Sequence, residues 1–195
     1  METIFYNLVL VEKIREVLEL LIGQIDFVEK KIELGYVMPL QLHSRYPKDQ
    51  ILAAFGFTTF DKKSSNREGV AFSEFLNMEI LFITLTKSAE NFSPTTLYED
   101  FAISDTLFNW QSQNAARPDR GKGLRYIDHR KLGKKILLFV REQTDDEFGT
   151  TMGFVFLGEA DYVEHSGEKP MTIMWRLREE MPAFIWKASG KLAVG

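Results

Sequence analysis

The residues best suited to chemistry in this chain lie together in one short stretch. Two aromatic residues run directly into four amide or hydroxyl side chains, in the order Phe108-Asn-Trp110-Gln111-Ser112-Gln113-Asn114. Amides can pair with base edges through a donor and an acceptor, and aromatic rings can stack on a base. The stretch therefore favours contact with nucleobases. The alternative is that Phe108 and Trp110 are core residues on one strand face, with exposed amides between them.

A second candidate cluster lies just before this stretch and places a carboxylate beside aromatic rings. Asp100 follows Tyr98 by two residues, and a carboxylate in an aromatic pocket can accept a hydrogen bond from the amino group of cytosine. Tyr126 is a third candidate pocket aromatic. The expected base-binding residues are Tyr98, Asp100, Trp110, Gln111, Ser112, Gln113, Asn114 and Tyr126.

A basic segment follows the amide-rich stretch, although the whole chain has a net charge of −4. Residues 111–141 hold nine Lys and Arg against two Asp, whereas residues 142–168 hold eight acids and no Lys or Arg. This asymmetry predicts one phosphate-facing side, and the alternative is a basic loop that only aids solubility. The expected phosphate-binding residues are Arg117, Arg120, Lys122, Arg125, Arg130 and Lys131, and residues 120–125 are expected to form a basic turn.

The residues needed for catalysis are absent from the sequence. The chain has three His and no Cys, and it contains no Gly-x-Ser-x-Gly, phosphate-cradling or dinucleotide-binding motif. We therefore expect no enzyme activity, no metal site and no cofactor. The lack of Cys fits a reducing cytoplasm, and no signal peptide or membrane span is expected.

Apolar periodicity predicts an α+β fold, in which a β-rich small barrel, open or closed, follows two N-terminal helices. Residues 11–32 have the 3,4 spacing of a helix seam with Gly35 as its stop, and Pro47 and Gly56 frame a second helix. The first helix could pack on the sheet, on a second copy in a homodimer, or on another module. Strands are expected at residues 78–86, 107–112, 135–141, 153–158 and 171–178. The expected division is a helix at 1–35 and a barrel domain at 36–195.

Short pieces of sequence between residues 39 and 182 occur in the order found in a known family. They include Pro39-Leu-Gln-Leu-His43-Ser-Arg-Tyr46, Arg67-Glu-Gly69, Phe92-Ser-Pro-Thr-Thr-Leu-Tyr98, Asp100-Phe-Ala-Ile-Ser104, Leu107-Phe-Asn-Trp-Gln-Ser-Gln-Asn114, Leu138-Phe-Val-Arg141 and Gly167-Glu-Lys-Pro-Met171. This set resembles the C-terminal domain of unknown function of bacterial superfamily II helicases that carry a phospholipase-D-like nuclease. The family commonly has His at the position of Asn109, so no role that needs an imidazole is expected there.

The resemblance implies the target-recognition domain of a Type IV restriction enzyme, with a barrel similar to SRA and PUA domains. Such a domain would bind double-stranded DNA, flip out a cytosine carrying a 5-methyl or 5-hydroxymethyl group, and serve a helicase/nuclease module in cis or in trans. The alternative is a protein-interaction or regulatory module that docks on a helicase through its N-terminal helix. Deletion of residues 1–34 would separate the two, because DNA binding should survive it under the first hypothesis.

Overall fold

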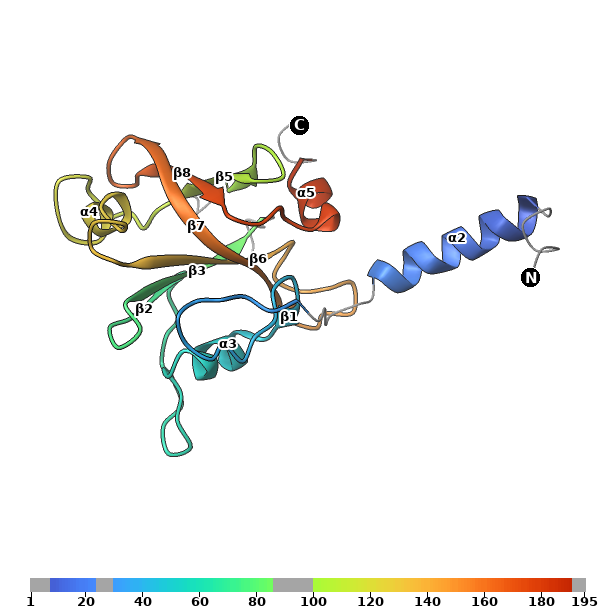
Figure 1. Cartoon of the computed structure of the whole chain (residues 1–195), viewed down its shortest axis with the longest axis horizontal. Coiled ribbons are helices and arrows are strands. Elements are labelled where there is room, and N and C mark those ends of the chain that lie inside the picture. Colours follow the sequence, from blue (N-terminus) through green and yellow to red (C-terminus); the bar gives the residue numbers. More distant parts are fainter. Residues whose placement is uncertain (1–7, 24–29, 86–99, 191–195) are drawn as a thin grey trace.

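The protein folds into one curved β-sheet flanked by short helices, and the computed structural model describes residues 8–23, 30–85 and 100–190 (Figure 1). It is a mixed α+β structure. In chain order its elements are α2 (Leu8–Gly23), β1 (Arg45–Tyr46), α3 (Lys48–Ala54), β2 (Val70–Ser73), β3 (Met78–Thr84), β4 (Phe101–Ala102), β5 (Leu107–Gln111), α4 (Gly121–Ile127), β6 (Lys135–Arg141), β7 (Phe154–Ser166), β8 (Thr172–Leu177) and α5 (Ala183–Gly190).

The eight strands form a single sheet in the order β2-β3-β6-β7-β8-β5-β4, with β1 paired to β7. Strands β3 and β6 are parallel, and the register pairs Thr84 with Arg141. Strand β7 runs antiparallel to β6, so Phe154 at its start lies at the same end as Arg141. Three strand ends therefore meet at one edge of the sheet.

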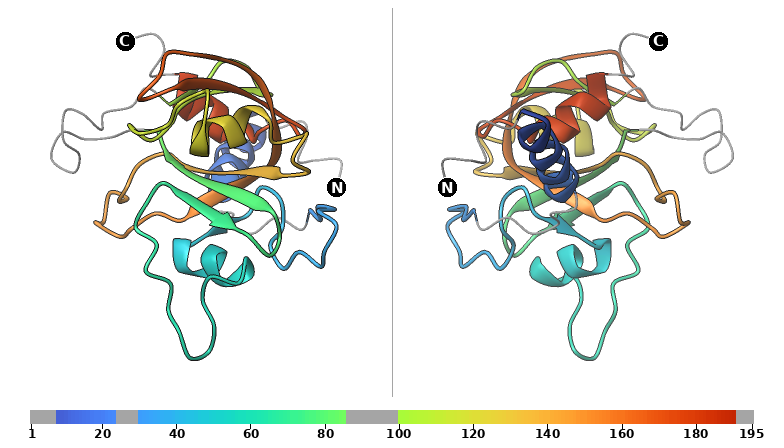
Figure 2. Two further views of the ribbon diagram at one scale, coloured as in Figure 1. Left: turned by 90° about the vertical axis from the view of Figure 1, so that its left-hand side faces the viewer. Right: turned by 90° about the vertical axis from the view of Figure 1, so that its right-hand side faces the viewer.

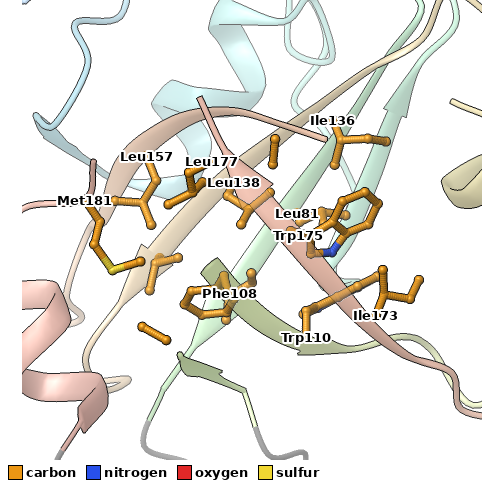
Figure 3. Packing of buried hydrophobic residues seen from close by; sticks show 14 of the residues in the cluster. Leu81, Phe108, Trp110, Ile136, Leu138, Leu157, Ile173, Trp175, Leu177 and Met181 are labelled. Carbon is orange, nitrogen blue, oxygen red and sulfur yellow. The ribbon is translucent and has the colours of Figure 1, made fainter. Parts of the chain in front are cut away.

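Both faces of the central strands are buried, which explains their nearly continuous apolar sequence. Leu81, Leu138 and Leu157 belong to a core cluster that also contains Phe108 and Trp175 (Figure 3). On the opposite face, alternate residues of the same strands form a second cluster, which α3 covers with its buried Ile51, Leu52 and Phe55. In β8 the predicted alternation is confirmed, since Met171, Ile173, Trp175 and Leu177 are all buried.

The sheet curls strongly but does not close into a barrel, which corrects that part of the expected fold (Figure 2). Among the described residues no strand pairing joins β2 or β3 to β4 or β5, because β4 is only two residues long. A bulge between Leu138 and Phe139 interrupts the β6–β7 register opposite Gly158. Gly158 has φ +91, and a Cβ there would meet Leu42 Cδ1 at 2.9 Å. Such bulges bend a sheet.

The helices differ from the sequence expectations in several places. Helix α3 is confirmed between Pro47 and Gly56, but it follows β1, so only α2 precedes the sheet. Helix α2 is described over Leu8–Gly23, residues 24–29 lie outside the described residues, and residues 30–34 are not helical although the predicted helix ran to 32. The buried side chain of Leu34 instead packs in the second core cluster, so a deletion through residue 34 would remove core. The predicted turn at 120–125 lies mostly in helix α4.

Within residues 9–18 of α2, the apolar side chains are largely exposed, including Val9, Val17 and Leu18. Figure 1 shows α2 to one side of the sheet. None of the helices in the described ranges has the length and hydropathy required to cross a membrane. The three partners considered for this helix, and the division at residue 35, stay predictions.

Candidate nucleic-acid interface

A pocket of about 1120 Å³ opens where the ends of β3, β6 and β7 approach β5. It is lined by Pro47, Lys48, Asp49, Arg67, Glu68, Gly69, Val70, Phe82, Thr84, Asp100, Trp110, Gln111, Gln113, Asn114, Ala115, Lys122, Arg141, Thr151, Met152 and Phe154. Five of the eight residues expected to bind a base are in this lining: Asp100, Trp110, Gln111, Gln113 and Asn114. The volume is large enough for a nucleotide.

The curl of the sheet brings the two walls of this pocket together. Val70 lies on β2 and Trp110 on β5, which are far apart in the strand order, yet both belong to one core cluster and both line the pocket. The third side comes from the strand ends at Thr84, Arg141 and Phe154. The pocket thus occupies the gap that the incomplete barrel leaves at one end.

Asp100 is buried at the pocket wall, with 4% of its surface exposed. Its Oδ1 accepts a hydrogen bond of 2.8 Å from the backbone N–H of Gln111. This bond ties the carboxylate to the strand that carries the amide-rich stretch. Asp100 therefore places a hydrogen-bond acceptor beside Trp110 and Gln111, as the sequence predicted for a base pocket.

The side-chain amide of Gln113 is held by a hydrogen bond to its oxygen, whereas its nitrogen has no partner in the described residues. The Tyr126 hydroxyl donates to Gln113 Oε1 at 2.9 Å, and burial raises the pKa of Tyr126, so this hydroxyl keeps its proton. Gln113 Nε2 is buried and has no hydrogen-bond partner in the described part of the chain. Since an unpaired buried donor is costly, Gln113 is the lining residue whose N–H groups a hydrogen-bond acceptor would stabilise.

Ser112 and Tyr126 support the pocket from behind and do not line it. Ser112 is fully buried, and its Oγ accepts from the Met171 N–H at 2.9 Å and donates to the Gln113 carbonyl at 3.2 Å. Tyr126 is fully buried as well, with its ring 5.4 Å from that of Trp110. Both residues therefore fix the backbone and side chain of Gln113.

Trp110 combines a core position with a place in the pocket lining. Along β5, Phe108 and Trp110 are buried while Leu107, Asn109 and Gln111 are partly exposed, as in the alternative that makes both aromatics core residues. Trp110 packs against Tyr126 and Trp175 and keeps 4% of its surface exposed. Only a small part of the ring is left for contact with a ligand.

The six cations expected to bind phosphate do not gather at the pocket. Lys122 alone lines it, and its Nζ lies 3.1 Å from Glu68 Oε2. Four others also pair with acids: Arg117 with Asp119 and Glu168, Arg125 with Glu79, Arg130 with Asp161, and Lys131 with Asp128. Glu79 is 1% exposed, so Arg125 neutralises a buried carboxylate. Arg120 is exposed at the N-terminal end of α4.

Three other cations line the pocket that the sequence analysis did not include in the site: Lys48, Arg67 and Arg141. They come from three separate segments, the start of α3, the loop before β2 and the end of β6. No salt bridge involving any of the three occurs within 8–23, 30–85 and 100–190. The register of β3 with β6 and the curl of the sheet bring them together, and of the three only Arg141 belongs to the basic segment 111–141.

The remaining expected residue, Tyr98, lies outside the residues that the structure describes. In the described part of the chain, no group of three or more His, Asp or Glu side chains is arranged to hold a metal ion.

A family model described as "Domain of unknown function (DUF3427)" matches residues 40–188 of this chain. No curated protein matches this chain. Two solved structures of the SUVH5 SRA domain, one with methylated CHH DNA and one with fully methylated CG DNA, are similar over 77% of this chain. They have 10% and 9% identity, TM-scores of 0.43 and 0.44, and 99% and 100% of their own lengths covered. The SUVH9 structure has 11% identity and a TM-score of 0.41, with 88% of this chain and 36% of that chain covered.

Proposed function

This chain belongs to the DUF3427 family, and we propose that it is a non-catalytic DNA-binding module that reads a 5-methyl- or 5-hydroxymethylcytosine flipped out of duplex DNA. The observation that carries the proposal is one pocket that joins the Asp100 carboxylate, three amides and Trp110 to several cations. The resemblance to Type IV restriction enzymes suggests that a helicase/nuclease module uses this recognition, in cis or in trans. That module would supply the cleavage.

The polar groups of the pocket complement the hydrogen-bonding edge of cytosine. Cytosine presents an amino donor at N4 and acceptors at N3 and O2. Asp100 is the acceptor for the N4 amino group. The Gln113 amide, whose oxygen is hydrogen-bonded to Tyr126, is the donor to N3 or O2 of the base. Thymine carries the same 5-methyl group but an oxygen at position 4, which would face the carboxylate unfavourably. The proposed Asp100 and Gln113 contacts therefore distinguish 5-methylcytosine from thymine.

Base flipping costs a few kcal/mol, and the pocket must offset this cost. Partial stacking on Trp110 and hydrogen bonds to Asp100 and Gln113 are the interactions available for it. Since Tyr126 is fully buried, its contribution is to orient Gln113 and not to stack on the base. Arg125 neutralises buried Glu79, so its role here is in stability more than in phosphate binding.

The test is binding to matched duplexes that carry one cytosine, one 5-methylcytosine or one thymine at the same position. The wild-type chain is expected to prefer 5-methylcytosine over thymine by 1–3 kcal/mol, roughly 5- to 150-fold. Asp100→Asn keeps an oxygen for the Gln111 N–H but loses the charge, and it should remove most of that preference. Fluorescence anisotropy across a salt series gives the affinities.

Asp105→Asn is the matched control for this variant, because Asp105 lies in the same segment but does not line the pocket. It should bind all three duplexes as the wild type does. Equal affinity of the wild type for cytosine and 5-methylcytosine would contradict the reading of a modification. Affinity that does not depend on salt would contradict duplex binding itself.

A further inference from the structure

One wall of the pocket contains two cation–π contacts, and the two aromatic rings involved are neighbours. Lys48 Nζ lies 4.7 Å from the centroid of the Phe82 ring, and the Arg141 guanidinium lies 4.6 Å from that of Phe154. The two rings are 5.4 Å apart at an angle of 69°. All four residues line the pocket. This cation–aromatic wall, Lys48, Phe82, Phe154 and Arg141, is distinct from the part of the lining that holds Asp100 and Gln113.

The cations of this wall keep hydrogen-bond donors that the protein does not use. Arg141 donates from Nε to Thr84 Oγ1 at 2.9 Å and from Nη1 to the carbonyls of Thr144 and Met152 at 3.3 and 3.2 Å. In the described residues its Nη2 makes no hydrogen bond. Lys48 Nζ donates to the Glu68 carbonyl at 2.8 Å, which leaves two of its three protons. These contacts hold the Arg141 guanidinium in place, and the N–H groups of its Nη2 stay unused within the described residues.

The acids near this wall have cations of their own. Asp49 pairs with Lys63 at 2.7 Å, and Glu68 pairs with Lys122 at 3.1 Å. Neither Lys48 nor Arg141 forms a salt bridge with any acid of the described ranges. Burial lowers the pKa of both groups, and the charge of Arg141 lowers that of Lys48 further, whereas Asp49 and Glu68 raise the pKa of Lys48 and Asp145 raises that of Arg141. Two half-buried cations that form no salt bridge in the described ranges favour the arrival of an anion.

We propose that Lys48 and Arg141 form an anion subsite that takes a phosphate of the DNA strand whose base enters the Asp100–Gln113 side of the pocket. The inference rests on the proposed function for the identity of the ligand. Arg is suited to bidentate phosphate contacts and Lys to a point-charge contact, so the pair supplies both kinds. A nucleotide, with base and phosphate in one molecule, would then occupy both parts of one pocket.

Four small ligands separate the two parts: deoxycytidine, 5-methyldeoxycytidine and the 5′-monophosphate of each, titrated into the full chain and followed by NMR. Each monophosphate should bind about tenfold more tightly than its nucleoside, as expected for one charge-assisted contact. Lys48→Met should reduce that ratio to near one, and Lys48→Arg should restore most of it. Lys62→Met is the matched control and should leave the ratio unchanged, because Lys62 is exposed and does not line the pocket.

Nucleosides that bind as tightly as their monophosphates, or four ligands that all fail to bind, would overturn the subsite. The result also separates the subsite from the proposed function. A phosphate effect that is equal for both bases, without preference for the methyl group, supports the subsite and contradicts the reading of a modified base. A preference for 5-methylcytosine without a phosphate effect supports the reading of a modified base and contradicts the subsite.

Discussion

The two ends of strand β6 carry cations in opposite situations. At its start, Lys135 Nζ lies 3.2 Å from Glu159 Oε2, and Arg178 binds the same carboxylate at 2.9 Å. At its end, Arg141 contacts a hydroxyl, two carbonyls and an aromatic ring, and it has no acid partner in the described chain. One end is neutralised within the protein and the other is available to a ligand. A basic residue is therefore informative about binding only once its partners are known.

The same contrast applies to the basic segment that was expected to bind phosphate. The segment is strongly basic along the chain, but the acids that neutralise it come from distant positions such as Glu68, Glu79 and Asp161. Those pairs form only in the folded protein. The pocket cations are fewer, and only Lys122 and Arg141 of them belong to the basic segment.

The largest effect is expected for the cation at the end of β6 that has no acid partner in the described chain, compared with the paired cation at its start. Arg141→Met should weaken binding to a 5-methylcytosine duplex about 10- to 100-fold, since hydrogen bonds to charged groups contribute about 1.5–3 kcal/mol. Lys135→Met should change the affinity by less than about twofold. Anisotropy titrations measure both, with thermal melts to establish that each variant is folded. Equal losses would mean that binding depends on net charge alone, and the contrast between the two ends would be lost.

A smaller effect, on stability, should appear at the neutralised end. Asp161 accepts hydrogen bonds from Arg130 and Arg178 at 3.0–3.1 Å. Asp161→Asn is expected to lower the free energy of unfolding by about 1–2 kcal/mol while leaving duplex affinity unchanged. Urea denaturation measures the first quantity and anisotropy the second. A variant that lost DNA binding at full stability would assign this cluster to the interface instead.

The stability difference should also depend on pH. Burial alone would raise the pKa of Asp161, but the hydrogen bonds and charges of Arg130 and Arg178 outweigh it and hold the pKa well below its usual range. Such a group stabilises the fold above its unfolded pKa of about 4, and this contribution is lost as the pH falls further. The gap between wild type and Asp161→Asn should therefore be full at pH 7 and shrink below about pH 4.

The smallest expected effect is a change in the salt dependence of binding. Each phosphate contact contributes about 0.9 to the slope of log K against log salt concentration for duplex DNA. Lys48→Met should reduce the slope by about 1, whereas Arg130→Met should leave it unchanged because Arg130 is already paired with Asp161. Titrations at several salt concentrations test this. A reduced slope in Arg130→Met would extend the interface to the far end of the sheet.

The parts of the fold that sequence periodicity predicted are those whose side chains alternate or run apolar over five or more residues. Strands β3, β5, β6 and β8 lie within a few residues of their predicted bounds. Strands β1 and β4 have only two residues each and carry no periodic signal. Helices α4 and α5 have seven and eight residues and were missed. In α4, Gly123 reads as a turn signal, yet it is required because a Cβ there would collide with the Arg117 carbonyl.

The candidate site likewise contains residues that the sequence indicated and residues that it did not. Asp100, Trp110, Gln111, Gln113 and Asn114 are close in sequence, and their chemical types suggested a pocket before its shape was known. Lys48 and Arg141 are 93 residues apart in the chain, and they meet only because β3 and β6 are parallel neighbours and β7 returns beside them. The burial of Tyr126 and the acid partners of the basic segment are likewise results of packing, which residue types alone do not specify.

The curl of the sheet has one more consequence. The two walls of the pocket belong to opposite ends of the strand order and meet without backbone pairing in the described residues, so the width of the opening depends on how sharply the strands between them bend. The bulge beside Gly158 contributes to that bend, and Leu42 lies close to this glycine. A side chain added there would alter ligand fit from a position that no ligand reaches.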